Sequence, residues 1–135
     1  MNTLTAARPS TTSDALLRFA MRLDATLTGL GGLGIAAFAN PLATLTGLAP
    51  TQEYVLGAAF VLYGVVVFRL AGLPSVRRAG GWVIFANIVC TVAAAVVVID
   101  ELAPLTTAGV AVTLACGVYT ATFAVLQYLG VRRLA

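Results

Sequence analysis

The chain alternates between long apolar blocks and short polar connections. Apolar side chains dominate about residues 20–40, 54–73, 82–100 and 105–129. A helix that crosses a bilayer needs about 20 predominantly apolar residues, and the last three blocks reach that length unaided. The first block reaches it only by recruiting residues before Ala25 or after Asn40. Because backbone groups in hydrocarbon must bond within their own segment, the pattern predicts four spanning helices.

Proline, glycine and acidic residues interrupt the apolar pattern. Asn40-Pro41 is predicted to end the first helix, because proline disfavours the helical conformation of the residue before it. Residues 41–52 are mildly apolar and are expected to form a loop at the membrane interface. The signals that mark the second and third loops are Pro74, Gly80, Gly81, Asp100, Glu101 and Pro104.

The segment before the first block divides into two parts. Residues 1–12 are polar and lack periodicity, which predicts a disordered tail. Ser13 is a residue type that caps helices, and Asp14 and Arg18 have the four-residue spacing of a helical ion pair. Residues 13–23 are therefore expected to be helical, either as a separate interfacial helix or as the polar end of the first span.

A second interpretation of this region is a cleavable signal peptide. The basic stretch, the short apolar core and Ala37-Phe38-Ala39 fit that pattern and would leave three spans. The length of the preceding region and the presence of Asp14 and Asp24 argue against it.

The amino-acid composition predicts whether these helices face water or lipid. Hydrophobic residues make up 60% of the 135 residues and charged residues 10%, against roughly 45–50% and 25% in soluble domains. A small domain cannot hide that much apolar surface from water. Residues 13–135 are therefore predicted to form an all-α, membrane-embedded four-helix bundle with antiparallel, up-down-up-down topology.

Charge sets the orientation of this bundle. The acidic residues Glu53, Asp100 and Glu101 lie at connections on one predicted side of the membrane. The other side carries all eight basic residues, namely Arg8, Arg18, Arg22, Arg69, Arg77, Arg78, Arg132 and Arg133. The positive-inside rule then predicts cytoplasmic termini and a multi-pass protein of the inner or plasma membrane. The arginine pairs are expected to serve this orientation, with contact to anionic lipid headgroups as the alternative.

Asp24 is the one carboxylate predicted to lie within a span. Residues equidistant from a hairpin turn lie at similar depth, and a turn near residues 45–47 sets Asp24 level with Arg69 near the cytoplasmic edge of the lipid. We expect these two to form a structural ion pair. The alternatives are that each side chain extends separately to the headgroups, or that Asp24 pairs with Arg22.

A second polar group is predicted deeper in the membrane. A turn near Ala103 sets Asn87 level with Tyr119, and Tyr63 and Thr91 belong to the same candidate cluster. Polar residues within lipid are functional candidates by default. The simpler interpretation, which we favour, is that the amide of Asn87 makes an interhelical hydrogen bond that fixes packing.

The chain contains few residues of the types that enzymes use for catalysis. There is no histidine, so the commonest metal ligand and general base are missing. Cys90 and Cys116 lie apart within apolar blocks and are expected to be small packing residues rather than a redox pair. We predict no catalytic, metal-binding or cofactor-binding residues, no cofactor and no enzyme activity.

Four stretches of the chain form a recognisable set, namely Arg22-Leu23-Asp24-Ala25, Gly57-x-x-Phe60-x-x-Tyr63-Gly64, Asn87 and the ending Leu126-Gln127-Tyr128-Leu129-Gly130-Val131-Arg132-Arg133. With them the sequence resembles a group of uncharacterised small four-span integral membrane proteins of actinobacteria and proteobacteria. The resemblance covers about residues 18–134, although Cys90 stands where that group often has tryptophan. The resemblance implies fold and membrane location but no reaction.

Two functions are therefore expected. The first is a non-catalytic integral membrane protein that acts as an accessory, assembly or scaffold component, with a membrane-protein partner or a second copy. The alternative is a small oligomeric transporter or channel, in which Asp24 is the only candidate for proton coupling. The bilayer is the expected surrounding, and the arginines form no stripe of the kind that binds nucleic acid.

Overall fold

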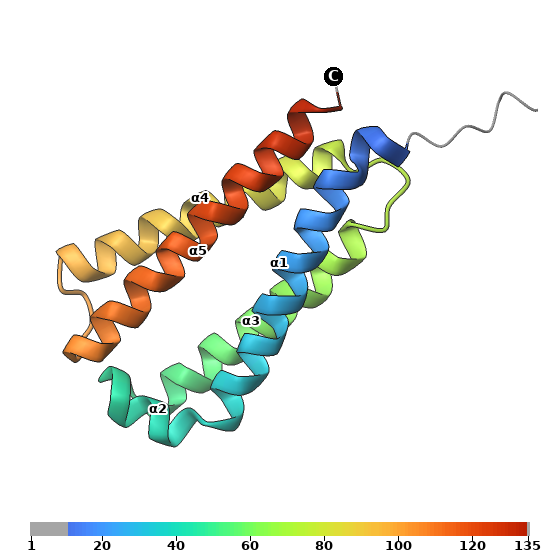
Figure 1. The fold of residues 1–135 in the computed structure, drawn as a ribbon. Coiled ribbons are helices and arrows are strands. Elements are labelled where there is room, and N and C mark those ends of the chain that lie inside the picture. The colour runs from blue at the N-terminus through green and yellow to red at the C-terminus, as the bar shows by residue number, and fades with distance from the viewer. Residues whose placement is uncertain (1–10, 135) are drawn as a thin grey trace, which may run out of the picture.

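Helices are the only regular secondary structure in the described part of the chain. The computed structural model describes residues 11–134, so nearly all of the predicted disordered tail, residues 1–12, lies outside the described residues. The helices are α1 (Thr11–Ala37), α2 (Ala39–Thr46), α3 (Pro50–Leu70), α4 (Arg77–Ile99) and α5 (Thr107–Arg132), shown in Figure 1. This confirms the all-α prediction.

Three of these helices are long and apolar enough to cross a membrane. They are α3, α4 and α5, judged by length and composition. Asp14–Ala37 of α1 and the short helix α2 pass the same test together, although the chain bends by 93° between them. The structure therefore has three candidate spans, or four if this bent pair counts as one.

Helix α1 begins well before the first apolar block. It runs unbroken from Thr11, so the segment 13–23 is the polar end of the first long helix and not a separate helix. The predicted pair between Asp14 and Arg18 forms, with 3.0 Å between Oδ2 and Nη2. The guanidinium of Arg18 also donates to the carbonyls of Ala71 at 2.8 Å and Leu73 at 2.6 Å. Arg18 thereby fastens the start of α1 to the end of α3.

The predicted loop over residues 41–52 is wrong. Helix α1 breaks at Phe38, and α2 then runs from Ala39 to Thr46. Pro41 falls in the first turn of α2, where a missing N–H leaves no helical hydrogen bond unmade. Gly47, with a φ of 90°, ends α2 in the left-handed conformation that glycine adopts without strain. The proline thus marks the start of a helix and not the end of one.

The helices pack as two pairs that α1 connects. Helix α1 packs along α3, α4 packs along α5, and α1 also contacts α5. The carboxyl end of α5 lies near the start of α1 (Figure 1), where a Cβ on Gly130 would meet the backbone of Leu17 at 2.7 Å. At the other end α2 contacts the start of α5, where the N–H of Thr106 donates to the carbonyl of Thr46 at 2.9 Å.

Glycines allow α1 and α3 to touch backbone to backbone. A Cβ on Gly32 would lie 2.6 Å from the carbonyl oxygen of Gly57, and one on Gly57 would lie 2.7 Å from that of Gly32. Further along, a Cβ on Gly64 would lie 2.6 Å from the carbonyl oxygen of Ala25. Such contacts admit only hydrogen at the interface. The glycines therefore fix which residues of α1 and α3 face each other.

Polar side chains are buried beside the apolar core of this fold, and large apolar side chains cover much of its outside. Asp24, Asn87 and Gln127 are at most 2% exposed. Large apolar side chains on the long helices are exposed instead, as in Ile99 at 76% and Val118 at 67%. Soluble domains bury aliphatic residues and rarely leave contiguous apolar surface open. The outer surface of this fold is therefore suited to an apolar solvent.

The glycine contact generates a matched pair of variants. Gly32→Ala should lower the free energy of unfolding by about 1–3 kcal/mol, because the new methyl group meets backbone that cannot move aside. Gly31→Ala, one residue away, meets nothing within 4 Å and should be neutral or stabilising by up to about 1 kcal/mol. The measurement is SDS-induced unfolding in detergent, followed by circular dichroism. Equal losses in both variants would contradict the close helix contact.

Candidate functional site

The buried carboxylate of Asp24 is the centre of the polar interior. Its side chain is 0% exposed. One oxygen, Oδ2, accepts three hydrogen bonds, from the hydroxyl of Tyr63 at 2.7 Å, Nδ2 of Asn87 at 2.9 Å and Nε2 of Gln127 at 2.9 Å. These donors come from α3, α4 and α5. A single oxygen of α1 therefore contacts each of the other three long helices.

The second carboxylate oxygen has its own donors. Oδ1 of Asp24 accepts from the hydroxyls of Thr28 and Tyr119, each at 3.1 Å. The Tyr119 hydroxyl also lies 3.1 Å from the main-chain carbonyl of Asp24 and 2.9 Å from Oγ1 of Thr28. The carboxylate is thus enclosed by five polar side chains that carry no charge, each able to donate a hydrogen bond.

The two amides of the site also bond to each other. Nδ2 of Asn87 donates to Oε1 of Gln127 at 2.9 Å, in addition to its bond to Asp24. This arrangement defines the orientation of Gln127, because the opposite orientation would set its carbonyl oxygen against the carboxylate. The site is therefore a connected network in which the amides of α4 and α5 support one another.

Helical spacing explains how the sequence delivers these groups. Thr28 follows Asp24 by four residues on α1, which puts both side chains on one face. Tyr119, Phe123 and Gln127 repeat at four-residue spacing along α5 and form one stripe. Tyr119 and Gln127 therefore reach Asp24 from the two sides of the buried ring of Phe123.

The predicted Asp24–Arg69 ion pair is wrong. Arg18–Asp14 is the ion pair found among the described residues, and Arg69 is exposed. Tyr63, which contacts Asp24, precedes Arg69 by six positions, or about 9 Å along a helix. The level of Arg69 was predicted from a simple turn near residues 45–47, but those residues belong to α2 and its end. The glycine contacts set a different register, in which Asp24 faces Tyr63.

This register also sets Asp24 deeper in the bundle than the sequence suggested. Asn87, its partner on α4, lies ten residues beyond Arg77, the first residue of that helix. At the rise of an α-helix this separation is about 15 Å. Asp24 therefore lies well inside the helices and not at the edge marked by the arginines.

The members of the predicted polar cluster occupy two positions. Tyr63, Asn87 and Tyr119 all lie on the Asp24 carboxylate. Thr91 lies one turn further along α4, where its hydroxyl donates to the carbonyl of Asn87 at 3.0 Å and lies 2.7 Å from the hydroxyl of Thr120. Thr91 therefore braces the α4–α5 contact without touching Asp24.

Two donors to the carboxylate were not among the predicted site residues. The signal for Thr28 was its four-residue spacing from Asp24. The signal for Gln127 was its place on the same face of α5 as Tyr119. Cys90 and Cys116 are free and exposed, so neither belongs to this network.

A second buried carboxyl group holds the opposite end of the fold together. Glu53 of α3 is 3% exposed, and its Oε1 accepts from the hydroxyl of Thr46 on α2 at 2.6 Å. Thr106, at the start of α5, donates through its hydroxyl to the carbonyl of Leu45. Helix α2 is thereby fastened to both α3 and α5.

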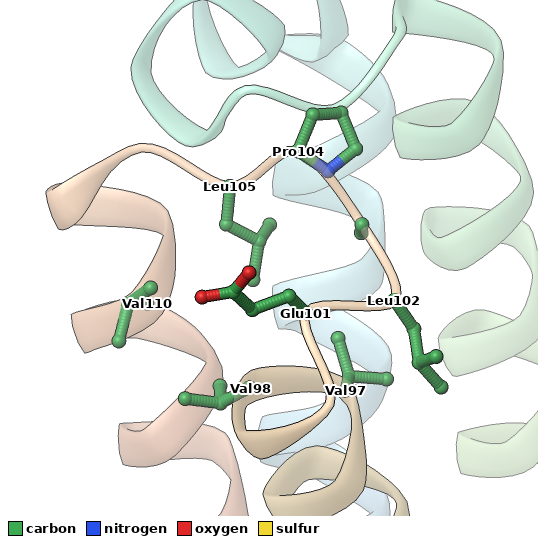
Figure 2. Close-up of a pocket in the computed structure, with 8 residues that line it drawn as sticks. Val97, Val98, Glu101, Leu102, Pro104, Leu105 and Val110 are labelled. Carbon is green, nitrogen blue, oxygen red and sulfur yellow. The ribbon is translucent and has the colours of Figure 1, made fainter.

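The connection between α4 and α5 lines a third feature, an open pocket. Figure 2 shows the carboxylate of Glu101 among the aliphatic side chains of Val98, Leu105 and Val110. Glu101 has a φ of 50°, an uncommon value for a residue with a side chain. The residues that line this pocket offer one carboxylate among apolar groups, so it provides less chemistry than the Asp24 network.

Comparison of the chain with protein-family models, with curated proteins and with solved structures finds no match. Among the described residues, no group of three or more histidine, cysteine or acidic side chains has the arrangement of a metal site.

Two substitutions distinguish the hydrogen-bond network of Asp24 from an Asp24–Arg69 ion pair. Asp24→Asn should lower the free energy of unfolding by about 2–4 kcal/mol, because it removes charge-assisted bonds and turns a donor toward other donors. Arg69→Gln should change stability by less than about 0.5 kcal/mol, because Arg69 is exposed and pairs with no acidic side chain among the described residues. Both are measured by SDS-induced unfolding. A large loss in Arg69→Gln would restore the ion pair.

Proposed function

We propose that this chain is a multi-pass integral protein of the cell membrane, with four spans in antiparallel order and both termini in the cytoplasm. The observation that carries this proposal is the exposure of large aliphatic and aromatic side chains along the long helices, combined with a buried carboxylate and two buried amides beside the apolar core. In lipid the outer surface is solvated by acyl chains, and the polar groups must find their partners within the protein.

Within the membrane we propose a non-catalytic role as an accessory, assembly or scaffold component. This proposal is supported by the structural role of the buried polar residues. The carboxylate of Asp24 receives donors from α1, α3, α4 and α5, so its contacts hold the helices together. A rigid bundle with a large apolar exterior is suited to packing against other membrane proteins.

Orientation is tested by chemical labelling in cells. In a variant with both native cysteines replaced by alanine, Glu101→Cys should react with a membrane-impermeant maleimide in intact cells. Arg133→Cys should react only after the membrane is opened, because the arginine-rich side is held in the cytoplasm. Gel-shift of the labelled protein is the measurement. The opposite pattern would invert the topology, and labelling of both sites in intact cells would refute the span count.

One observation favours a second candidate, a small transporter. The carboxylate of Asp24 is buried at the level of Asn87, which lies about 15 Å along α4 from Arg77. The hydrogen-bond donors of this carboxylate are uncharged side chains. Intramembrane carboxylates of this kind serve proton relays in transporters and pumps. The role would require Asp24 to gain and lose a proton during transport, with Tyr63, Asn87 and Gln127 released and recaptured.

Purification and reconstitution distinguish the two candidates. The scaffold role predicts that the tagged chain, extracted in mild detergent, keeps one membrane-protein partner at fixed stoichiometry through size-exclusion chromatography. It also predicts no proton-driven solute uptake in liposomes. The transporter role predicts uptake by the chain alone, lost in Asp24→Asn and retained in part by Asp24→Glu. Uptake with that pattern would overturn the scaffold role.

A further inference from the structure

A groove runs along the first turns of α4, beside the end of α5. It is lined chiefly by Arg77, Arg78, Gly81, Trp82, Phe85 and Val131. Gly80, next to this groove, packs against Val131, since a Cβ there would lie 3.3 Å from the Val131 side chain. The α4–α5 contact therefore brings the start of one helix and the end of the other to the same wall.

The groove is charged at one end and apolar at the other. Arg77 and Arg78 lie in the first turn of α4, and Phe85 lies about 12 Å further along the helix axis. Trp82 and Phe85 are 65% and 59% exposed, and their rings meet edge to face at 6.2 Å. A Cβ on Gly81 would meet nothing within 4 Å, so the space beside the rings is open.

Among the described residues, no acidic side chain pairs with the arginines of the groove. Arg132 and Arg133 follow Val131 directly, which gives four arginines at this end of the α4–α5 pair. All five acidic residues of the chain are described, and none of them pairs with these arginines. Asp100 and Glu101 lie beyond the far end of α4, about 35 Å away along the helix.

We propose that this groove binds one anionic phospholipid, with its phosphate on Arg77 and Arg78 and an acyl chain along Trp82 and Phe85. Guanidinium groups bind phosphate through paired hydrogen bonds. Indole rings favour the headgroup level of a bilayer, which sets the apolar part of the groove at the start of the acyl region. A second copy of this chain fits poorly, because it would bring its own arginines against the same charge.

Trp82 is the single tryptophan of the chain, so the tryptophan fluorescence reports on the surroundings of this one side chain of the groove. The full chain is reconstituted in phosphatidylcholine vesicles that contain an equal, minor fraction of brominated phosphatidylglycerol or brominated phosphatidylcholine. Bromine on the acyl chain quenches the indole on contact. The phosphatidylglycerol should quench as though enriched at Trp82, by roughly 5-fold for each arginine engaged. Equal quenching by the two lipids would overturn the proposal.

Three variants separate the groove from general surface charge. Arg77→Gln with Arg78→Gln should abolish the preference. Arg22→Gln with Arg69→Gln removes the same charge from exposed positions outside the groove and should retain it. Gly81→Leu fills the groove with the charge unchanged and should abolish the preference too. Equal loss in the two arginine double variants, or an unchanged preference in Gly81→Leu, would contradict the groove.

A soluble anion provides the last comparison. Glycerol phosphate should not restore Trp82 fluorescence, because it lacks the acyl chain that the aromatic wall contacts. Restoration by glycerol phosphate would show that the arginines hold a headgroup anion without the lipid. Circular dichroism of each variant establishes that its helices are intact.

Discussion

The hydrogen bonding of one carboxylate organises this fold. A charged oxygen is costly to remove from water, and the cost falls only when donors replace the lost hydration. Asp24 obtains three donors on one oxygen and two on the other. Because these donors lie on all four long helices, the carboxylate cannot be satisfied until the helices have assembled. The residue that is most costly to bury therefore specifies how the helices must pack.

The glycines determine which residues reach that carboxylate. Gly32 with Gly57, and Gly64 with Ala25, allow α1 and α3 to approach until backbone meets backbone. A contact this close tolerates no sliding, since a shift by one residue would bring side chains into the interface. Gly130 likewise allows the backbone of α5 to approach Leu17 of α1 closely. Small residues without chemistry of their own thus set the positions of Tyr63 and Gln127, which do the bonding.

The helix content of this fold could be predicted because the apolar blocks are long and the polar connections between them are short. Long apolar blocks predict helices, and the last three blocks correspond to α3, α4 and α5. The predictions failed for contacts between helices, because packing and not the composition of each segment decides which residues of two helices meet. Asp24 was set level with Arg69 by counting residues around a turn, and α2 together with the glycine contacts moved that register. Gln127 contacts Asp24 because of the register of α5 against α1. The periodicity of either helix alone does not predict that register.

The proposed lipid groove and the buried network depend on the same helix. Helix α5 carries Tyr119 and Gln127 to Asp24, and about one turn beyond Gln127 it carries Val131 to the groove. The close contact between Gly130 and Leu17 lies between these two points and fixes the helix against α1. Movement of α5 would therefore disturb Gln127 and Val131 together. A lipid held between α4 and α5 would stabilise the arrangement in which Asn87 and Gln127 both face the carboxylate, which links the occupancy of the arginine-rich end to the integrity of the polar interior.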